Sequence, residues 1–108
     1  MHKAFEALNS LSKTVCADAY SHGLWDDVPT DQERHYCARR VMDEAEEALL
    51  ACGDREHFRE ELADVVIMAL SSAAYLGINI GEEVRRKMLI NHDRPYRHGK
   101  EEGSCRNL

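Results

Sequence analysis

The chain has 108 residues, of which 44% are hydrophobic and 31% are charged, so we expect one domain with a hydrophobic core. Its 14 basic residues against 20 acidic ones give a formal net charge of −6. That balance argues against a protein that binds a nucleic-acid polymer, because such proteins are normally basic. No apolar run predicts a transmembrane span or a signal peptide. We therefore expect a cytoplasmic protein that does not bind a membrane.

The first half of the chain predicts two helices separated by a loop. Apolar residues recur at helical spacing over residues 3–21, and the segment Leu24 to Pro29 predicts a loop. Thr30 followed by Glu33 has the spacing of a capping box, so we expect the second helix to begin at Thr30 and to run to about Cys52.

The second half predicts two more helices and a tail. Gly53 suits the position after a helix and Asp54 suits an N-cap, which predicts a tight turn before a third helix over residues 55–76. Asn79 with Glu82 predicts the start of a fourth helix near Ile80. That helix should end by residue 92 or 93, because Pro95 disfavours helix at the residue before it.

These elements predict an all-α fold, a four-helix bundle that contains an antiparallel helical hairpin. The domain should cover residues 1–94, with a polar tail over residues 95–108. The third helix is apolar nearly all round, which is more than a monomeric bundle needs. We therefore expect a homodimer, or a dimer of dimers, that covers its second face.

The four cysteines do not form a metal or redox motif. Cys16, Cys37, Cys52 and Cys105 include no C-x-x-C step, and their spacing relative to the histidines is not that of a zinc site. Cys37 and Cys52 fall on an apolar stripe, where a free cysteine behaves as a small hydrophobic residue. We expect reduced thiols with no catalytic part.

Two pairs of carboxylates lie on the two helices of the predicted hairpin. Glu44 and Glu47 form an E-x-x-E step, and Glu61 and Asp64 form an E-x-x-D step at a similar height above the turn. Residues three apart on a helix share a face, so the four side chains converge if the pairs face each other. Acids at this spacing are also common on solvated surfaces. Mg²⁺ binds oxygen ligands such as these carboxylates, and it normally completes its coordination shell with waters and phosphates.

Asp64 weakens the surface interpretation. It is the only charged residue in the run LADVVIMALSSAAYL. An isolated buried carboxylate is costly, so it is normally paired, protonated or bound to a metal. We therefore expect Asp64 to be buried and to contribute to a cation site.

The fourth helix carries a candidate phosphate-binding face. Lys87, Asn91 and Arg94 have a spacing that returns to nearly the same side of the helix. Lysine as a point charge and arginine as a planar fork are common phosphate ligands. Basic residues near a helix C-terminus also complement its dipole without binding anything. Trp25, the single tryptophan, lies in the predicted loop and is either a stacking surface for a base or a plug of the core.

The ordered set of these motifs resembles the MazG-like all-α nucleoside triphosphate pyrophosphohydrolases. The strings DEAEEALLA, EELADVVIMAL and KMLINHDRPYRHGK carry the resemblance, which covers about residues 20–100. The ending RPYRHGK is similar to the small, single-domain branch of the family.

The resemblance implies an enzyme that uses Mg²⁺, with Mn²⁺ as an alternative ion, to split the α–β bond of a nucleoside triphosphate. The products are a nucleoside monophosphate and pyrophosphate, and removal of non-standard nucleotides is a role that the family suggests. Its metal ligands map onto Glu44, Glu47, Glu61 and Asp64, one of which orients or deprotonates the attacking water instead. Contacts to the triphosphate and sugar map onto Lys87, Asn91 and Arg94, and the base remains unassigned because members vary most in the loop of Trp25.

Two other functions compete with this one. Phosphoribosyl-ATP pyrophosphohydrolase of histidine biosynthesis shares the acidic helices, but its third helix typically carries a Tyr-His after the E-x-x-D step, where this chain has VVIMAL. A catalytically silent helical dimer, used as an interaction module, is an alternative of another class. The complete set of acids and the basic helix argue against it.

Overall fold

The computed structural model describes residues 2–94, and they form four helices without a strand. The helices are α1 (His2–Ser21), α2 (Glu33–Leu50), α3 (Arg55–Tyr75) and α4 (Ile80–His92). The prediction of an all-α fold is confirmed for this part of the chain. The predicted tail over residues 95–108 lies outside the described residues.

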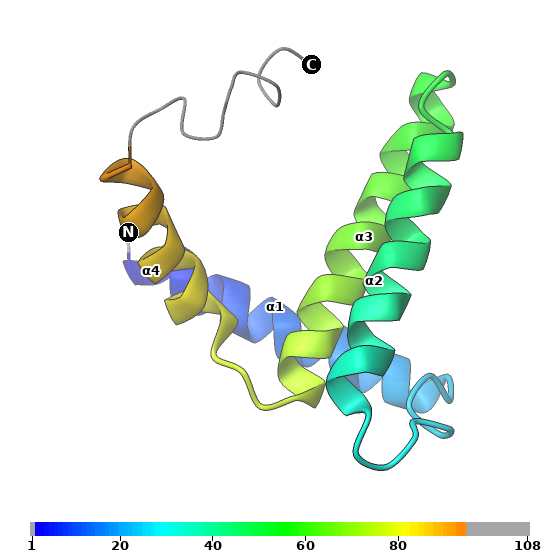
Figure 1. The fold of residues 1–108 in the computed structure, drawn as a ribbon, viewed down its shortest axis with the longest axis horizontal. Helices are drawn as coiled ribbons and strands as arrows, with labels where there is room; N and C mark the ends of the chain where they lie inside the picture. The colour runs from blue at the N-terminus through cyan, green and yellow to red at the C-terminus, as the bar shows by residue number, and fades with distance from the viewer. Residues whose placement is uncertain (1, 95–108) are drawn as a thin grey trace.

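The helices are arranged around α1 (Figure 1). Helices α2 and α3 lie side by side as an antiparallel hairpin, and α1 passes across the base of that hairpin. Helix α4 packs mainly along the N-terminal half of α1, with a minor contact to α3 near their connection. Within residues 2–94, α2 and α4 do not contact each other. The α2–α3 hairpin therefore projects away from α4, and the hairpin and α4 extend from α1 in diverging directions.

The turn between α2 and α3 is defined by Asp54. Its Oδ1 accepts hydrogen bonds from the backbone N–H groups of Glu56 and His57 at 3.1 and 3.3 Å, so the predicted N-cap is confirmed. Gly53 has no left-handed conformation, contrary to the expectation for a glycine just after a helix, and α2 ends earlier than predicted, at Leu50. The capping carboxylate thus determines where α3 begins, at Arg55.

The predicted start of α2 is wrong. The N-cap is Gln32, not Thr30, and its side chain makes no capping hydrogen bond. The reason lies at Asp31, whose φ of 68° is in the left-handed region and prevents a right-handed helix from continuing from Thr30. Thr30 is therefore part of the turn, and the predicted capping box with Glu33 does not form.

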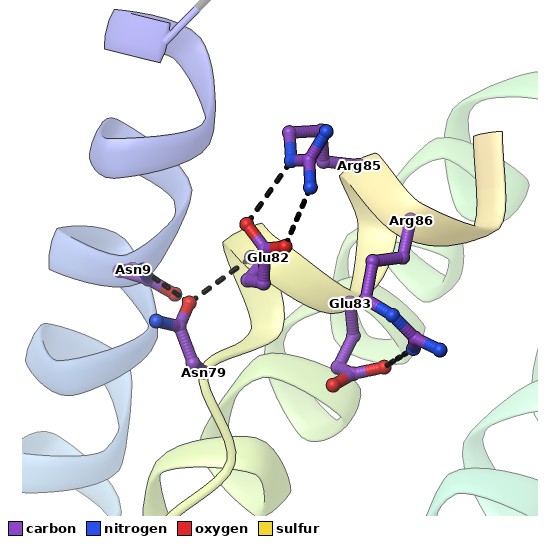
Figure 2. A network of polar contacts seen from close by, with 6 residues as sticks. All are labelled: Asn9, Asn79, Glu82, Glu83, Arg85 and Arg86. Carbon is purple, nitrogen blue, oxygen red and sulfur yellow. Dashed lines mark hydrogen bonds and ion pairs between the residues drawn. The ribbon is translucent and has the colours of Figure 1, made fainter. Parts of the chain in front are cut away.

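Polar contacts tie the start of α4 to α1 (Figure 2). The Oδ1 of Asn79 accepts from the N–H of Glu82 at 3.0 Å, which confirms the predicted cap, and also from Nδ2 of Asn9 at 2.8 Å. The N–H of Gly81 donates to Oδ1 of Asn9 at 2.8 Å. A Cβ on Gly81 would lie 2.3 Å from the carbonyl oxygen of Phe5, so only glycine permits this close approach. These contacts hold α4 on α1.

The core lies where α1, the loop before α2, and the hairpin meet. Trp25 stacks on Tyr75 of α3, with ring centroids 4.2 Å apart and planes 10° from parallel. The hydroxyl of Tyr36 on α2 donates to the carbonyl of Leu24 at 2.9 Å. Burial raises the pKa of the nearby Cys16 thiol, and the Trp25 indole acts in the opposite direction. The loop is thereby anchored to both helices of the hairpin.

Three of the four cysteines lie in the described residues and all three are free thiols. Cys16 and Cys37 are buried in the core, and Cys52 is exposed. No single helix of residues 2–94 is long and apolar enough to cross a membrane, although the sharply bent pair α3 and α4 passes the same test by length and composition.

Candidate metal centre

The hairpin brings three of the four predicted acids together. Glu44 of α2 and Glu61 and Asp64 of α3 each offer a carboxylate oxygen, and these oxygens all lie within 4.8 Å of one another. Glu44 and Glu61 are half-buried, and Asp64 is exposed. Because the acids come from facing turns of two antiparallel helices, the hairpin itself determines their separation.

Asp64 is exposed in the single chain, so the expectation that it is buried is not met there. Its apolar neighbours on α3 are also open to solvent: Leu62, Val66 and Ile67 have exposed fractions of 47%, 48% and 45%. Only the C-terminal part of α3 is buried, since α1 covers the hairpin at its base. The apolar composition of α3 therefore exceeds what one copy of the chain can bury.

Glu47 stands apart from the three converging acids. It is exposed and lies one turn closer to the tip of the hairpin than Glu44. Its charge nevertheless acts on Glu44, where it is among the causes of a raised pKa. A direct role for Glu47 in binding a metal stays a prediction.

The surroundings of Glu44 raise the pKa of its carboxyl group. Burial is the main cause of its raised pKa, and the charges of Glu47, Asp64 and Glu61 add to it. Arg40 acts in the opposite direction. The ionised form of Glu44 is thus disfavoured by its surroundings, which is the condition that a bound cation would relieve.

Sequence reasoning missed Arg40 and His57. Arg40 lies one turn before Glu44 and lines the same cavity as Glu44 and Asp64. A hydrogen bond of 3.1 Å joins Nε2 of His57 to Oε2 of Glu61, one turn further along α3. Both residues precede an acid of the cluster by four positions, which places them on its face of the helix. That spacing is the signal in the sequence that would have found them.

One carboxylate oxygen of the cluster is direct evidence for a cation site. Oε1 of Glu61 is buried and has no hydrogen-bond partner in the described part of the chain. A buried carboxylate oxygen without a partner is costly, and a cation would satisfy it. Carboxylate oxygens without thiol or imidazole ligands favour Mg²⁺, Mn²⁺ or Ca²⁺ over zinc or copper. The donor set therefore suits a hard divalent ion.

The basic face of α4 does not meet these acids within one chain. Lys87, Asn91 and Arg94 are all exposed, and α4 packs on α1, not on α2. Among residues 2–94, no hydrogen bond or ion pair links these three side chains to the acidic cluster. The neighbouring arginines of α4 are engaged in ion pairs of their own (Figure 2): Arg85 with Glu82, and Arg86 with Glu83.

Trp25 belongs to the core in the single chain. Its exposed fraction is 6%, and one face of its ring is covered by Tyr75. The ring thus fills the end of the hairpin. Its proposed role as a stacking surface for a base stays a prediction.

The chain is similar to a known nucleotide hydrolase. Over 47 residues it is 43% identical to the dATP/dGTP diphosphohydrolase of Cyanophage S-2L. That stretch is 44% of this chain and 45% of the relative, so the match spans less than half of either protein. No family model matches the chain, and no solved structure matches it.

Replacing Glu44 tests the electrostatics of the metal-free cluster. Because its pKa is raised from 4.5, the stability that Glu44 contributes is fully present below pH 4.5 and is lost as the pH rises through the folded-state value. Glu44→Gln cannot ionise and should raise the urea midpoint of the metal-free protein at neutral pH. The gain should shrink toward pH 4.

The matched control is Glu46→Gln, which alters an exposed acid of α2 outside the cluster. It should leave the midpoint nearly unchanged across the same pH range, measured in chelator by circular dichroism. A Glu44→Gln variant that is less stable than the wild type at neutral pH would show that the acids do not repel one another in the metal-free protein.

Proposed function

We propose that this protein is a Mg²⁺-dependent pyrophosphohydrolase that cleaves the α–β bond of nucleoside triphosphates, as a MazG-like enzyme would. The observation that carries the proposal is the convergence of Glu44, Glu61 and Asp64 across the hairpin. The similarity to a dATP/dGTP diphosphohydrolase supports the same chemistry from an independent direction. From that relative's name we take purine deoxynucleoside triphosphates as the first substrates to test.

The three acids, with Glu47 beside them, would hold the metal. When bound, Mg²⁺ supplies Lewis-acid activation of the phosphate and of a water at the site. The protein's own contribution is mainly positioning, since phosphoryl transfer requires aligned groups and charge stabilisation more than covalent chemistry. The hydrogen bond from His57 restrains Glu61 in one rotamer, so that its second oxygen remains free for the ion.

Arg40 supplies a positive charge on the cavity side of the cluster. It lines the cavity beside Glu44 and Asp64, so a phosphate bound there would lie within reach of the guanidinium group. This residue offers part of the basic surface that α4 does not supply in a single chain.

We further propose that the active form is a homodimer, or a dimer of dimers. Two observations support it: α3 exposes Leu62, Val66 and Ile67, and within residues 2–94 the basic face of α4 does not contact α2, which carries Glu44. Exposed apolar surface of this kind is typical of protein interfaces. A second copy packed on the hairpin would cover the apolar face and bring the basic face of its α4 toward the acids.

Light scattering tests the dimer. The wild type should have at least twice the mass of one chain at micromolar concentration, and Val66→Glu should reduce the mass to that of a monomer because a charge would be buried in the interface. Helix content measured by circular dichroism should be unchanged in this variant. A monomeric wild type would contradict the proposal.

Pyrophosphate release tests the activity. A panel of ribo- and deoxynucleoside triphosphates with Mg²⁺ should identify at least one substrate that yields pyrophosphate and a monophosphate. Glu61→Gln should lower kcat by about 100-fold or more, because the site would lose a ligand. Glu60→Gln, an exposed neighbour outside the cluster, is the matched control and should retain wild-type activity. Absence of release from every nucleotide would favour the silent interaction module.

A further inference from the structure

A cavity of about 240 Å³ adjoins the acidic cluster and is not explained by metal binding. Its charged lining residues are Arg40, Glu44 and Asp64 of the hairpin and Asp18 of α1, and its apolar ones include Leu24 and Met68. The lining residues come from α1, α2, α3 and the loop before α2, near the base of the hairpin where α1 packs on α3. A volume slightly below the range of ~300–1,000 Å³ typical of ligand pockets suits one part of a nucleotide.

Ser71 lines this cavity and carries an unexplained polar group. Its exposed fraction is 1%, and its hydroxyl has no hydrogen-bond partner in the part of the chain that the structure describes. A helical serine often donates its hydroxyl to a carbonyl of the preceding turn, and Ser71 makes no such bond. By contrast, the buried hydroxyl of Ser12 on α1 donates to the carbonyl of Leu70 on α3 at 2.6 Å. A buried hydroxyl without any partner is an unfavourable arrangement that a ligand would correct.

The position of Ser71 relative to the acids suggests which part of the ligand it meets. Asp64 and Ser71 are seven residues apart on one side of α3, about 10 Å along the helix axis. A nucleotide whose phosphates were held at Asp64 would have its sugar between the two residues and its base near Ser71. Along α3 the lining changes from the carboxylate of Asp64 through apolar Ile67 and Met68 to the hydroxyl of Ser71, an order that matches a nucleotide bound by its phosphates at Asp64.

We propose that this cavity receives the base of the nucleotide, and that the Ser71 hydroxyl hydrogen-bonds the substituent at the 6-position of a purine. Adenine has an amino donor at that position and guanine has a carbonyl acceptor. A hydroxyl both donates and accepts, so one serine would serve both bases. The inference rests on the proposed function for its substrate class.

The test compares Ser71→Ala with the wild type on two kinds of ligand. Dissociation constants are measured by calorimetry for dAMP, dGMP and the purine deoxynucleoside monophosphate without a 6-substituent, and KM values for the matching triphosphates. The wild type should bind dAMP and dGMP about fivefold more tightly than the unsubstituted purine, and Ser71→Ala should remove that difference. Its melting temperature should not fall, because the lost hydroxyl has no hydrogen-bond partner among residues 2–94.

Ser72→Ala is the matched control. Ser72 is also buried in α3 and its hydroxyl has no partner in the described residues, but it does not line the cavity. It should leave all of these constants unchanged. An equal effect of both variants would overturn the inference, because it would show a general disturbance of α3.

Two other outcomes also overturn the inference. Unchanged constants in Ser71→Ala would show that its hydroxyl does not contact the nucleotide. An equal loss of affinity for all three purines would place the contact on the sugar or phosphate. The binding measurement needs no turnover, so a wild type that binds the monophosphates selectively but releases no pyrophosphate would refute the proposed activity and leave the base contact established.

Discussion

The mutual approach of Glu44, Glu61 and Asp64 is the constraint on which this account depends. Three carboxylates with oxygens within 4.8 Å of one another repel, and the raised pKa of Glu44 reflects burial first and then the charges of Glu47, Asp64 and Glu61. Within residues 2–94, partial compensation comes from Arg40 beside Glu44 and from a hydrogen bond from His57 to Glu61. A divalent cation would complete the compensation, so the same arrangement that costs stability provides a binding site.

The rest of the fold keeps the two helices at the spacing that this site needs. The Asp54 cap starts α3 at the tip of the hairpin, and the stack of Trp25 on Tyr75 anchors its base. Helix α1 passes across the base and closes the cavity in which Ser71 lies. The acids lie between the tip and the base of the hairpin, where one side of α3 is exposed to solvent.

Local features were predictable from the sequence, because they depend on residues close together in the chain. Helical periodicity, the caps at Asp54 and Asn79 and the facing acids all follow from spacings of a few residues. The start of α2 was not predictable in this way, because the positive φ of Asp31 overrides the capping box that begins at Thr30. His57 and Arg40 each precede an acid of the cluster by four residues, but only the side-chain conformations show which acid each one meets.

The packing of the helices against one another was harder to predict. The spacing of Lys87, Asn91 and Arg94 indicated a shared face, but not that α4 lies on α1 and away from the acids. The apolar run around Asp64 indicated burial, which one chain does not provide, because α1 covers only the base of the hairpin. Which surfaces meet depends on the whole molecule, and the cavity at Ser71 exists only after three helices have been placed.

Calorimetric titration of the metal-free protein with Mg²⁺ tests the central claim most directly. We expect saturable binding at neutral pH that weakens by about tenfold or more in Asp64→Asn, since a ligand charge is lost. Asp43→Asn, an exposed acid of α2 outside the cluster, should bind as the wild type does. Equal affinity of the wild type and Asp64→Asn would contradict the assignment of the metal to this site.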